Sequence, residues 1–139
     1  MQLAKGKTSL TEAWDGGSSQ NHFMLGQIEE WFYHDLAGIR SDGNGFKKIT
    51  IAPQPVGDMT WAKASYNSVR GKIVSDWKRN GGQFTLKVTI PPNTTATVLV
   101  PTKSGGTTTA TAGARFLRMD FGCDVFEIGS GDYKFESSF

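Results

Sequence analysis

Hydrophobic residues follow two different periods along the chain, and the change between them falls near residue 42. From residue 21 to residue 39 they recur at intervals of three, four and seven, which predicts a helix. Two neighbouring stripes result: Met24, Ile28 and Trp31, then Leu25, Phe32, Leu36 and Ile39. Asn21, Ser18 or Ser19 suits the N-cap, because a short polar side chain can accept a hydrogen bond from the first turn. Gly38 weakens the helix near its end, and residues 41–45 stop it.

The predicted helix has a wide apolar surface. Large side chains cover more than one narrow face: Phe23, Met24, Leu25, Trp31, Phe32 and Tyr33. A helix with such a surface requires packing on more than one side. In a chain of this size only the part that follows the helix can cover it, so the pattern indicates a further neighbour. If none is present, we expect the exposed face to drive self-association.

Beyond residue 45 apolar and polar residues alternate, which predicts short strands. The clearest case runs from Gln83 to Ile90, where Phe84, Leu86, Val88 and Ile90 share one face. The preceding Arg-Asn-Gly-Gly at 79–82 predicts a hairpin turn in which glycine supplies a positive φ. The other predicted strands cover 46–51, 60–66, 69–77, 94–100, 125–128 and 133–135, and 104–113 is predicted to be a loop.

These elements predict a mainly β fold, an antiparallel β-sandwich preceded by one α-helix. The change of period divides the chain into residues 1–42 and residues 43–139. At 139 residues the chain is long enough to bury a substantial core.

Composition narrows the function classes. The net charge is only +2, from 15 Lys and Arg against 13 Asp and Glu, and the basic residues are scattered. We therefore expect no nucleic-acid partner and no membrane partner. The single cysteine, Cys123, excludes an intrachain disulfide and a cysteine-based metal site. Residues 1–7 lack the apolar core of a signal peptide, and the compartment stays open between cytoplasmic and periplasmic or secreted.

The candidate chemistry lies before the helix. Glu12 and Asp15 flank Trp14, Gly16-Gly17 follow, and His22 stands at the helix start. Aromatic rings beside carboxylates suit a sugar site, because the ring packs on the apolar face of the sugar while the carboxylates bind hydroxyls or move protons. A structural alternative stays open, in which Asp15 caps the helix, Glu12 is only exposed and His22 is structural. We expect no cofactor and no metal, since no second histidine stands at ligand spacing from His22.

Several sequence segments resemble bacterial α-L-rhamnosidases of glycoside hydrolase family 78. Thr11-Glu12-Ala13-Trp14-Asp15, Asn21-His22-Phe23-Met24-Leu25-Gly26 and Glu30-Trp31-Phe32-Tyr33 resemble the end of the family's catalytic domain. Gly57-Asp58-Met59-Thr60-Trp61-Ala62 and the stretch from Val88 to Val98 resemble the domain that follows it. The resemblance runs from about residue 8 to residue 101.

The resemblance implies a parent enzyme that hydrolyses terminal α-L-rhamnose from glycosides with inversion. It assigns residues 1–42 to the last loop and helix of an (α/α)6 catalytic barrel, and residues 43–139 to a C-terminal β-sandwich. Glu12 carries over as the general base, His22 as a contact to a sugar hydroxyl and Trp14 as a wall of the sugar pocket. The family's general acid lies upstream of any segment matched here, so the chain is expected to be inactive alone.

Two other roles stay open for the β-sandwich. A carbohydrate-binding module would need exposed coplanar aromatic rings, and Trp61, Tyr66 and Trp77 are the residues to test. Otherwise the sandwich braces the upstream catalytic barrel and these tryptophans lie in the core or at an interface. The position of the tryptophans distinguishes the two roles.

Overall fold

The computed structural model describes residues 6, 8, 11–13, 18–20 and 23–139, with the backbone alone for Phe23 and Leu25. The chain forms two compact units, Met1–Trp31 and Phe32–Phe139. Within the described ranges, no helix is long and apolar enough to cross a membrane.

Helical structure is confined to the first part of the described chain and to one short turn. A 3-10 turn at Phe23–Gly26 leads into α1 (Gln27–Trp31), and a π-helical turn, η3, follows at Phe32–Leu36. A further 3-10 turn, η4, spans Asn44–Phe46. The sequence correctly predicts a helix here.

The prediction that the helix reaches Ile39 is wrong. The segment of η2 (Phe23–Gly26), α1 and η3 ends at Leu36. Ile39 begins strand β1 (Ile39–Ser41), where it pairs with Ile51. Gly38 makes the change of direction with a φ of +78°. A Cβ atom at this position would lie 2.2 Å from the carbonyl carbon of Ala52, so only glycine fits.

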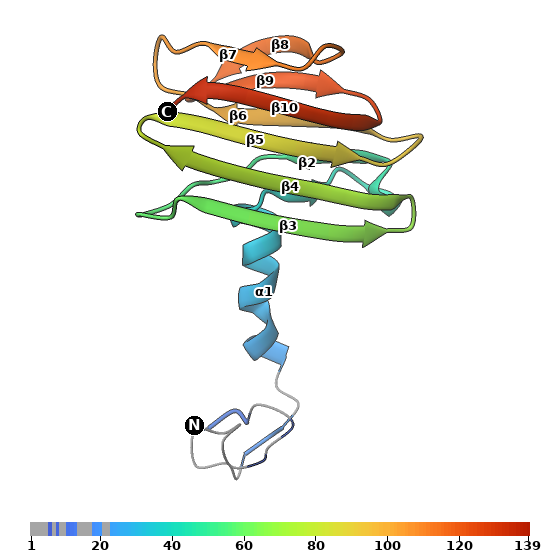
Figure 1. Cartoon of the computed structure of the whole chain (residues 1–139). Helices are drawn as coiled ribbons and strands as arrows, with labels where there is room; N and C mark the ends of the chain where they lie inside the picture. The colour runs from blue at the N-terminus through green and yellow to red at the C-terminus, as the bar shows by residue number, and fades with distance from the viewer. Residues whose placement is uncertain (1–5, 7, 9–10, 14–17, 21–22) are drawn as a thin grey trace. The chain divides into compact units, whose positions relative to one another are not determined.

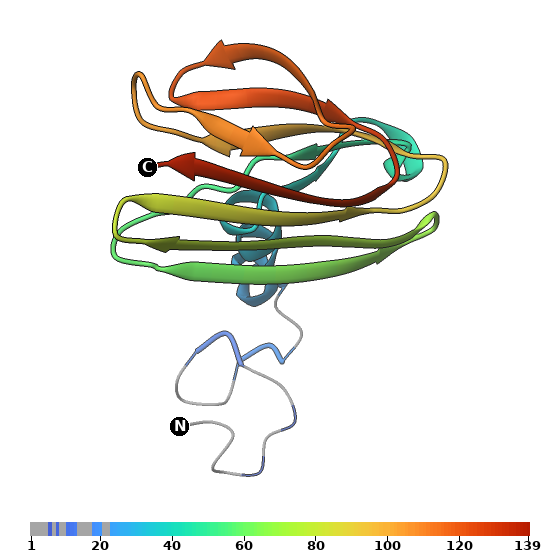
Figure 2. The same ribbon diagram turned by 45° about the horizontal axis from the view of Figure 1, so that its top comes forward.

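Among the described residues, ten strands form two sheets of five. Sheet A has the order β1-β2-β6-β9-β8, with β2 at Lys48–Ile51, β6 at Thr95–Pro101, β9 at Cys123–Ile128 and β8 at Arg115–Asp120. Sheet B has the order β3-β4-β5-β10-β7, with β3 at Trp61–Ser68, β4 at Gly71–Asn80, β5 at Gln83–Ile90, β10 at Gly131–Ser138 and β7 at Thr108–Ala110. Figures 1 and 2 show the sheets as two layers, with β3, β4, β5 and β10 side by side in one of them. In the described part of the chain, β2 and β6 pair in parallel and the other strand pairs are antiparallel.

The core lies between the two sheets, where the alternating side chains of each sheet meet. Trp77, Phe84 and Phe135 are fully buried there, with Ile49 and Val98 from the opposite sheet. Burial of β5 follows the predicted alternation, and β4 and β5 are joined by Gly81 and Gly82, whose φ angles are +56° and +81°. Two consecutive residues with positive φ match the right-handed twist of a two-residue hairpin. The predicted mainly β fold, an antiparallel sandwich preceded by one helix, is confirmed, although α1 is shorter than predicted.

Three strands at sheet edges are missing from the sequence prediction, and β1 is one of them. Strand β7 lies inside residues 104–113, which were expected to form a loop, and β8 was not predicted. β7 is three residues long and, among the strands described, pairs with β10 alone. In β8 a bulge between Phe116 and Arg118 interrupts the alternation. Edge strands bury few side chains, so their sequences carry little periodicity.

Strand pairing begins at Ile39, before the change of period near residue 42. The assignment of residues 1–42 to a catalytic barrel and of 43–139 to the sandwich stays a prediction.

Candidate functional site

Glu12 lies on a closed loop that exposes its side chain. Its backbone N–H donates a hydrogen bond of 2.9 Å to the carbonyl oxygen of Ser19. The preceding Thr11 is buried, and its hydroxyl donates to the carbonyl oxygen of Ala13 at 2.7 Å. These bonds hold the backbone on both sides of Glu12 while water can reach the side chain. A carboxylate on such a loop can serve as a general base.

The other predicted site residues, Trp14, Asp15 and His22, lie outside the described residues. Whether they surround a sugar together with Glu12 therefore stays a prediction. Glu12 is the one predicted site residue whose surroundings are described.

A polar joint fixes the end of the helical segment to the inner face of sheet B. The indole N–H of Trp77 donates to the carbonyl oxygen of Leu36 at 2.8 Å. The hydroxyl of Ser75 donates to the carbonyl oxygen of Ala37 at 2.6 Å. All four residues are buried. Carbonyls at the end of a helix lack partners within the helix, and β4 supplies them here.

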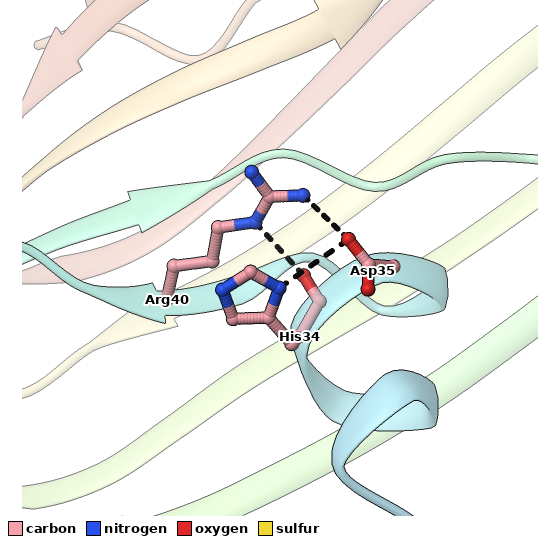
Figure 3. Close-up of polar contacts among 3 residues, drawn as sticks. All are labelled: His34, Asp35 and Arg40. Atoms are coloured by element: carbon pink, nitrogen blue, oxygen red, sulfur yellow. Dashed lines mark hydrogen bonds and ion pairs between the residues drawn. The ribbon is translucent and has the colours of Figure 1, made fainter. Parts of the chain in front are cut away.

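A charged contact reinforces the same connection from outside the core. The Arg40 guanidinium on β1 donates to the Asp35 carboxylate at 2.8 Å and to the carbonyl oxygen of His34 at 3.0 Å. The His34 ring nitrogen Nδ1 lies 3.3 Å from the same Asp35 oxygen. Figure 3 shows Arg40 and His34 converging on Asp35. The arrangement ties η3 to β1, which is a structural role.

An open groove of about 660 Å³ runs between η3 and strand β3. One wall consists of Phe32, Tyr33, Leu36 and Ala37, and the other consists of residues 58–65. Trp61 is the most exposed aromatic side chain in it, at 61%, and Phe32 and Tyr33 are exposed at 47% and 36%. The groove therefore presents aromatic surface to solvent.

The three aromatic residues proposed as a carbohydrate platform do not come together. Trp77 is in the core, as one of the two sequence interpretations predicts. Trp61 and Tyr66 are five residues apart on β3, so they point to opposite faces of the sheet. The Tyr66 ring packs on Phe46, with centroids 4.8 Å apart. Only Trp61 stands on the outer face, and a coplanar platform of these residues is absent.

The described residues show no cluster of metal ligands, and the one cysteine has a perturbed thiol. In the part of the chain that the structure describes, no three His, Cys, Asp or Glu side chains gather into a possible metal site. Cys123 is half-buried, and burial, followed by the carboxylates of Asp120 and Asp124, raises the pKa of its thiol. A raised pKa keeps the sulfur protonated and weakens it as a nucleophile or ligand.

The sequence placed Leu36 on the helix and offered Trp77 as a core residue, but it did not predict the joint between them. Leu36 and Ala37 accept through backbone carbonyls, which leave no mark in the sequence. The alternation in β4 did place Ser75 and Trp77 on one face. A buried serine in an otherwise apolar row was a signal that a backbone group needed a partner.

Comparison with known proteins gives one family. A model described as the bacterial alpha-L-rhamnosidase C-terminal domain matches residues 38–115. An α-L-rhamnosidase of Streptomyces avermitilis is 37% identical over 96% of this chain, and one of Formosa agariphila is 36% identical over 72%. The chain spans only 14% and 12% of the lengths of these two relatives.

Solved structures agree with the sequence relatives. The Streptomyces avermitilis α-L-rhamnosidase complexed with L-rhamnose superposes with a TM-score of 0.81 at 33% identity, covering 97% of this chain and 14% of that one. The α-L-rhamnosidase from Dictyoglumus thermophilum gives 0.82 at 29% identity, covering 99% of this chain and 17% of that one. The similarity extends over both described units.

Proposed function

This chain belongs to the family of bacterial α-L-rhamnosidase C-terminal domains, and from that premise we propose that its parent enzyme removes terminal α-L-rhamnose from glycosides with inversion. The observation that carries the proposal is the match over 97% of the chain to an α-L-rhamnosidase crystallised with L-rhamnose. The chain covers 14% of that protein, so most of the parent's catalytic machinery lies in other residues.

Glu12 is the general base of the proposed reaction. In an inverting glycosidase the base removes a proton from a water molecule on the face of the sugar opposite the leaving group. The base and the general acid stand about 6.5–9.5 Å apart so that this water fits. The exposure of Glu12 and the closure of its loop by Ser19 support the role. His22 binds a sugar hydroxyl and Trp14 forms a wall of the pocket.

The chain alone lacks the general acid and is inactive. Without a proton for the departing glycosidic oxygen, the leaving group is poor, and the base alone does not complete the reaction. The general acid belongs to the upstream catalytic barrel. Self-association of the isolated chain also stays a prediction.

The sandwich braces the catalytic domain. Support comes from the joint at Leu36 and Ala37, where buried donors from β4 hold the end of the helical segment. A loop carrying the general base needs a fixed position relative to the sugar, since small displacements of a catalytic group reduce the rate strongly. The joint holds η3 to the sandwich, and the sandwich supports the catalytic domain that carries the loop.

The test uses a chromogenic aryl α-L-rhamnoside with the parent enzyme and with this chain. We expect turnover by the parent only, and proton NMR of the parent's reaction should show the β anomer of rhamnose first. Initial release of the α anomer would exclude inversion. Turnover by the purified chain would mean that its own residues supply the acid, and the proposed division of the site would be wrong.

A further inference from the structure

The groove beside β3 has the composition of a protein interface. Three of its exposed side chains are aromatic, Phe32, Tyr33 and Trp61, and Met59 is half-buried beside them. Among the described residues that line it, Asp58 and Lys63 are the charged ones. Aromatic residues and methionine are enriched in the cores of protein interfaces, where charged residues are depleted. Tryptophan and tyrosine are also frequent among the residues that contribute most to binding.

Strand β3 adds an open sheet edge to this surface. It is eight residues long and, among the described residues, pairs with β4 alone. It contains no proline, and Lys63 is its only charged residue. Long edges with few charges invite pairing with other chains unless something covers them. By contrast, the edge strand β7 has only three residues, and β8 is interrupted by a bulge.

The walls of the groove are preformed. On one side, Leu36 and Ala37 are fixed by the hydrogen bonds from Trp77 and Ser75. On the other side, the carbonyl oxygen of Thr60 accepts a 2.8 Å bond from the backbone N–H of Arg79. A surface held from both sides loses little conformational entropy when it is covered.

We propose that this groove is the docking surface for the catalytic domain that precedes the sandwich in the parent enzyme, an inference that rests on the proposed function. The wall formed by Phe32 and Tyr33 continues, in sequence, the helical segment through which the parent chain enters the sandwich. The matched relatives extend far beyond the part that this chain covers, which provides a large covalently linked partner.

Two other occupants fit the surface less well. Of the three aromatic residues that the sequence offers as a glycan platform, only Trp61 is available here, because Tyr66 faces the other side of β3 and Trp77 is in the core. A second copy of the chain would have to bind at its dilute concentration. The catalytic domain is tethered to the groove wall, which raises its effective concentration to the millimolar range.

Hydroxyl-radical footprinting of this chain and of the parent enzyme tests the proposal. Tyr33, Met59 and Trp61 should be oxidised readily in the chain and several-fold more slowly in the parent. Met119 and Phe121, exposed at 64% and 105% on and beside β8, are the control positions and should react alike in both. Equal oxidation of the groove residues in the two proteins would overturn the proposal.

Protection within the isolated chain would also overturn it. Protection that increases with chain concentration would identify a second copy as the occupant, and protection by added methyl α-L-rhamnoside would identify a sugar site. Rhamnosidase activity of the parent is measured on the same sample. An active parent with an unprotected groove would refute the docking surface alone, whereas a parent without rhamnosidase activity would refute the proposed function.

Substitution of Trp61 by Ala in the parent is the complementary test. We expect a lower temperature of inactivation with unchanged kcat/KM at low temperature, because the residue acts at the interface and not on substrate. The matched control is Phe121→Ala, which removes an exposed aromatic ring at the β8–β9 turn and should leave the inactivation temperature unchanged. Equal inactivation temperatures for wild type and Trp61→Ala would contradict the proposal.

Discussion

The indole N–H of Trp77 donates a 2.8 Å hydrogen bond to the carbonyl oxygen of Leu36, across a separation of 41 residues. Both residues are buried, at 0% and 5% exposure. The largest side chain of the core therefore also satisfies the end of the helical segment. Packing and polar pairing meet at one residue, so the core itself holds the Leu36 end of η3.

Trp77→Phe should destabilise this chain by about 2–4 kcal/mol, because it leaves the buried Leu36 carbonyl without its donor and opens a small cavity. Urea unfolding followed by circular dichroism measures the effect. The matched control is Trp61→Phe at an exposed position, which should change the free energy of unfolding by less than about 0.5 kcal/mol. Equal effects of the two substitutions would show that the bond to Leu36 contributes nothing.

Gly38→Ala should cost more than about 3 kcal/mol, because it combines a positive φ with a clash against the backbone of Ala52. Gly105→Ala separates the two effects. Gly105 has a similar φ of +73° but nothing within 4 Å of the added atom, so we expect a loss of about 1 kcal/mol. Similar losses of unfolding free energy for the two variants in thermal unfolding would mean that the backbone at Ala52 moves to accommodate the methyl group.

Arg40→Ala should lower the free energy of unfolding by about 1 kcal/mol, because the guanidinium bonds both a carboxylate and a backbone carbonyl. The ion pair with Asp35 is partly exposed, so its own share is about 0.5 kcal/mol and should decrease with salt. A double-mutant cycle with Asp35→Ala measures that share. A coupling energy of zero at low salt would show that the Arg40–Asp35 ion pair in Figure 3 does not stabilise the fold.

In the parent enzyme, Glu12→Gln should lower kcat by about 10²–10⁴-fold while substrate still binds, because the amide cannot accept the proton from the attacking water. Steady-state kinetics with an aryl α-L-rhamnoside gives the rate, and calorimetry with rhamnose gives the binding. Glu30→Gln, which removes an exposed carboxylate on α1, is the matched control and should retain full activity. Substantial hydrolysis by the Glu12 variant would remove it as the base.

Cys123 should react slowly with a disulfide reagent at neutral pH. Burial and two nearby carboxylates raise the pKa of its thiol above the ordinary 9.0, so the reactive thiolate is scarcer than in a free cysteine. The linked stability has a defined sign: the protonated thiol is favoured in the fold, so this contribution is present below the unfolded pKa and is lost as the pH rises through the folded one.

The pH profile of Cys123 labelling measures the shift. We expect the rate to keep rising beyond pH 9 in the folded chain. In urea, where the thiol is exposed, it should level off at the ordinary pKa. Identical profiles in both states would show that the folded environment does not perturb the thiol.

The sequence anticipated much of the sandwich but little of the joint. Alternation over residues 83–90 reproduces β5 to the residue, because a strand buried on one face must place every second side chain in the core. The structure tests little of the predicted sugar site, since Glu12 is the one residue of that site in the described part of the chain. The sequence predicted a strand over residues 60–66 and named Trp61 as a candidate, but the groove lined by residues 58–65 was not predicted.

By itself, the sequence determined the mainly β class, the positions of the long strands and the hairpin turn at Gly81-Gly82, because period and glycine placement are local properties. Tertiary structure alone decided the parallel pairing of β2 with β6, the position of β10 between β5 and β7, and the helix end at Leu36. Each of these depends on contacts between segments distant in sequence: the Gly38 turn forms against Ala52, and the Leu36 carbonyl finds its donor on β4. Local patterns select the elements, and long-range pairing decides which of them meet.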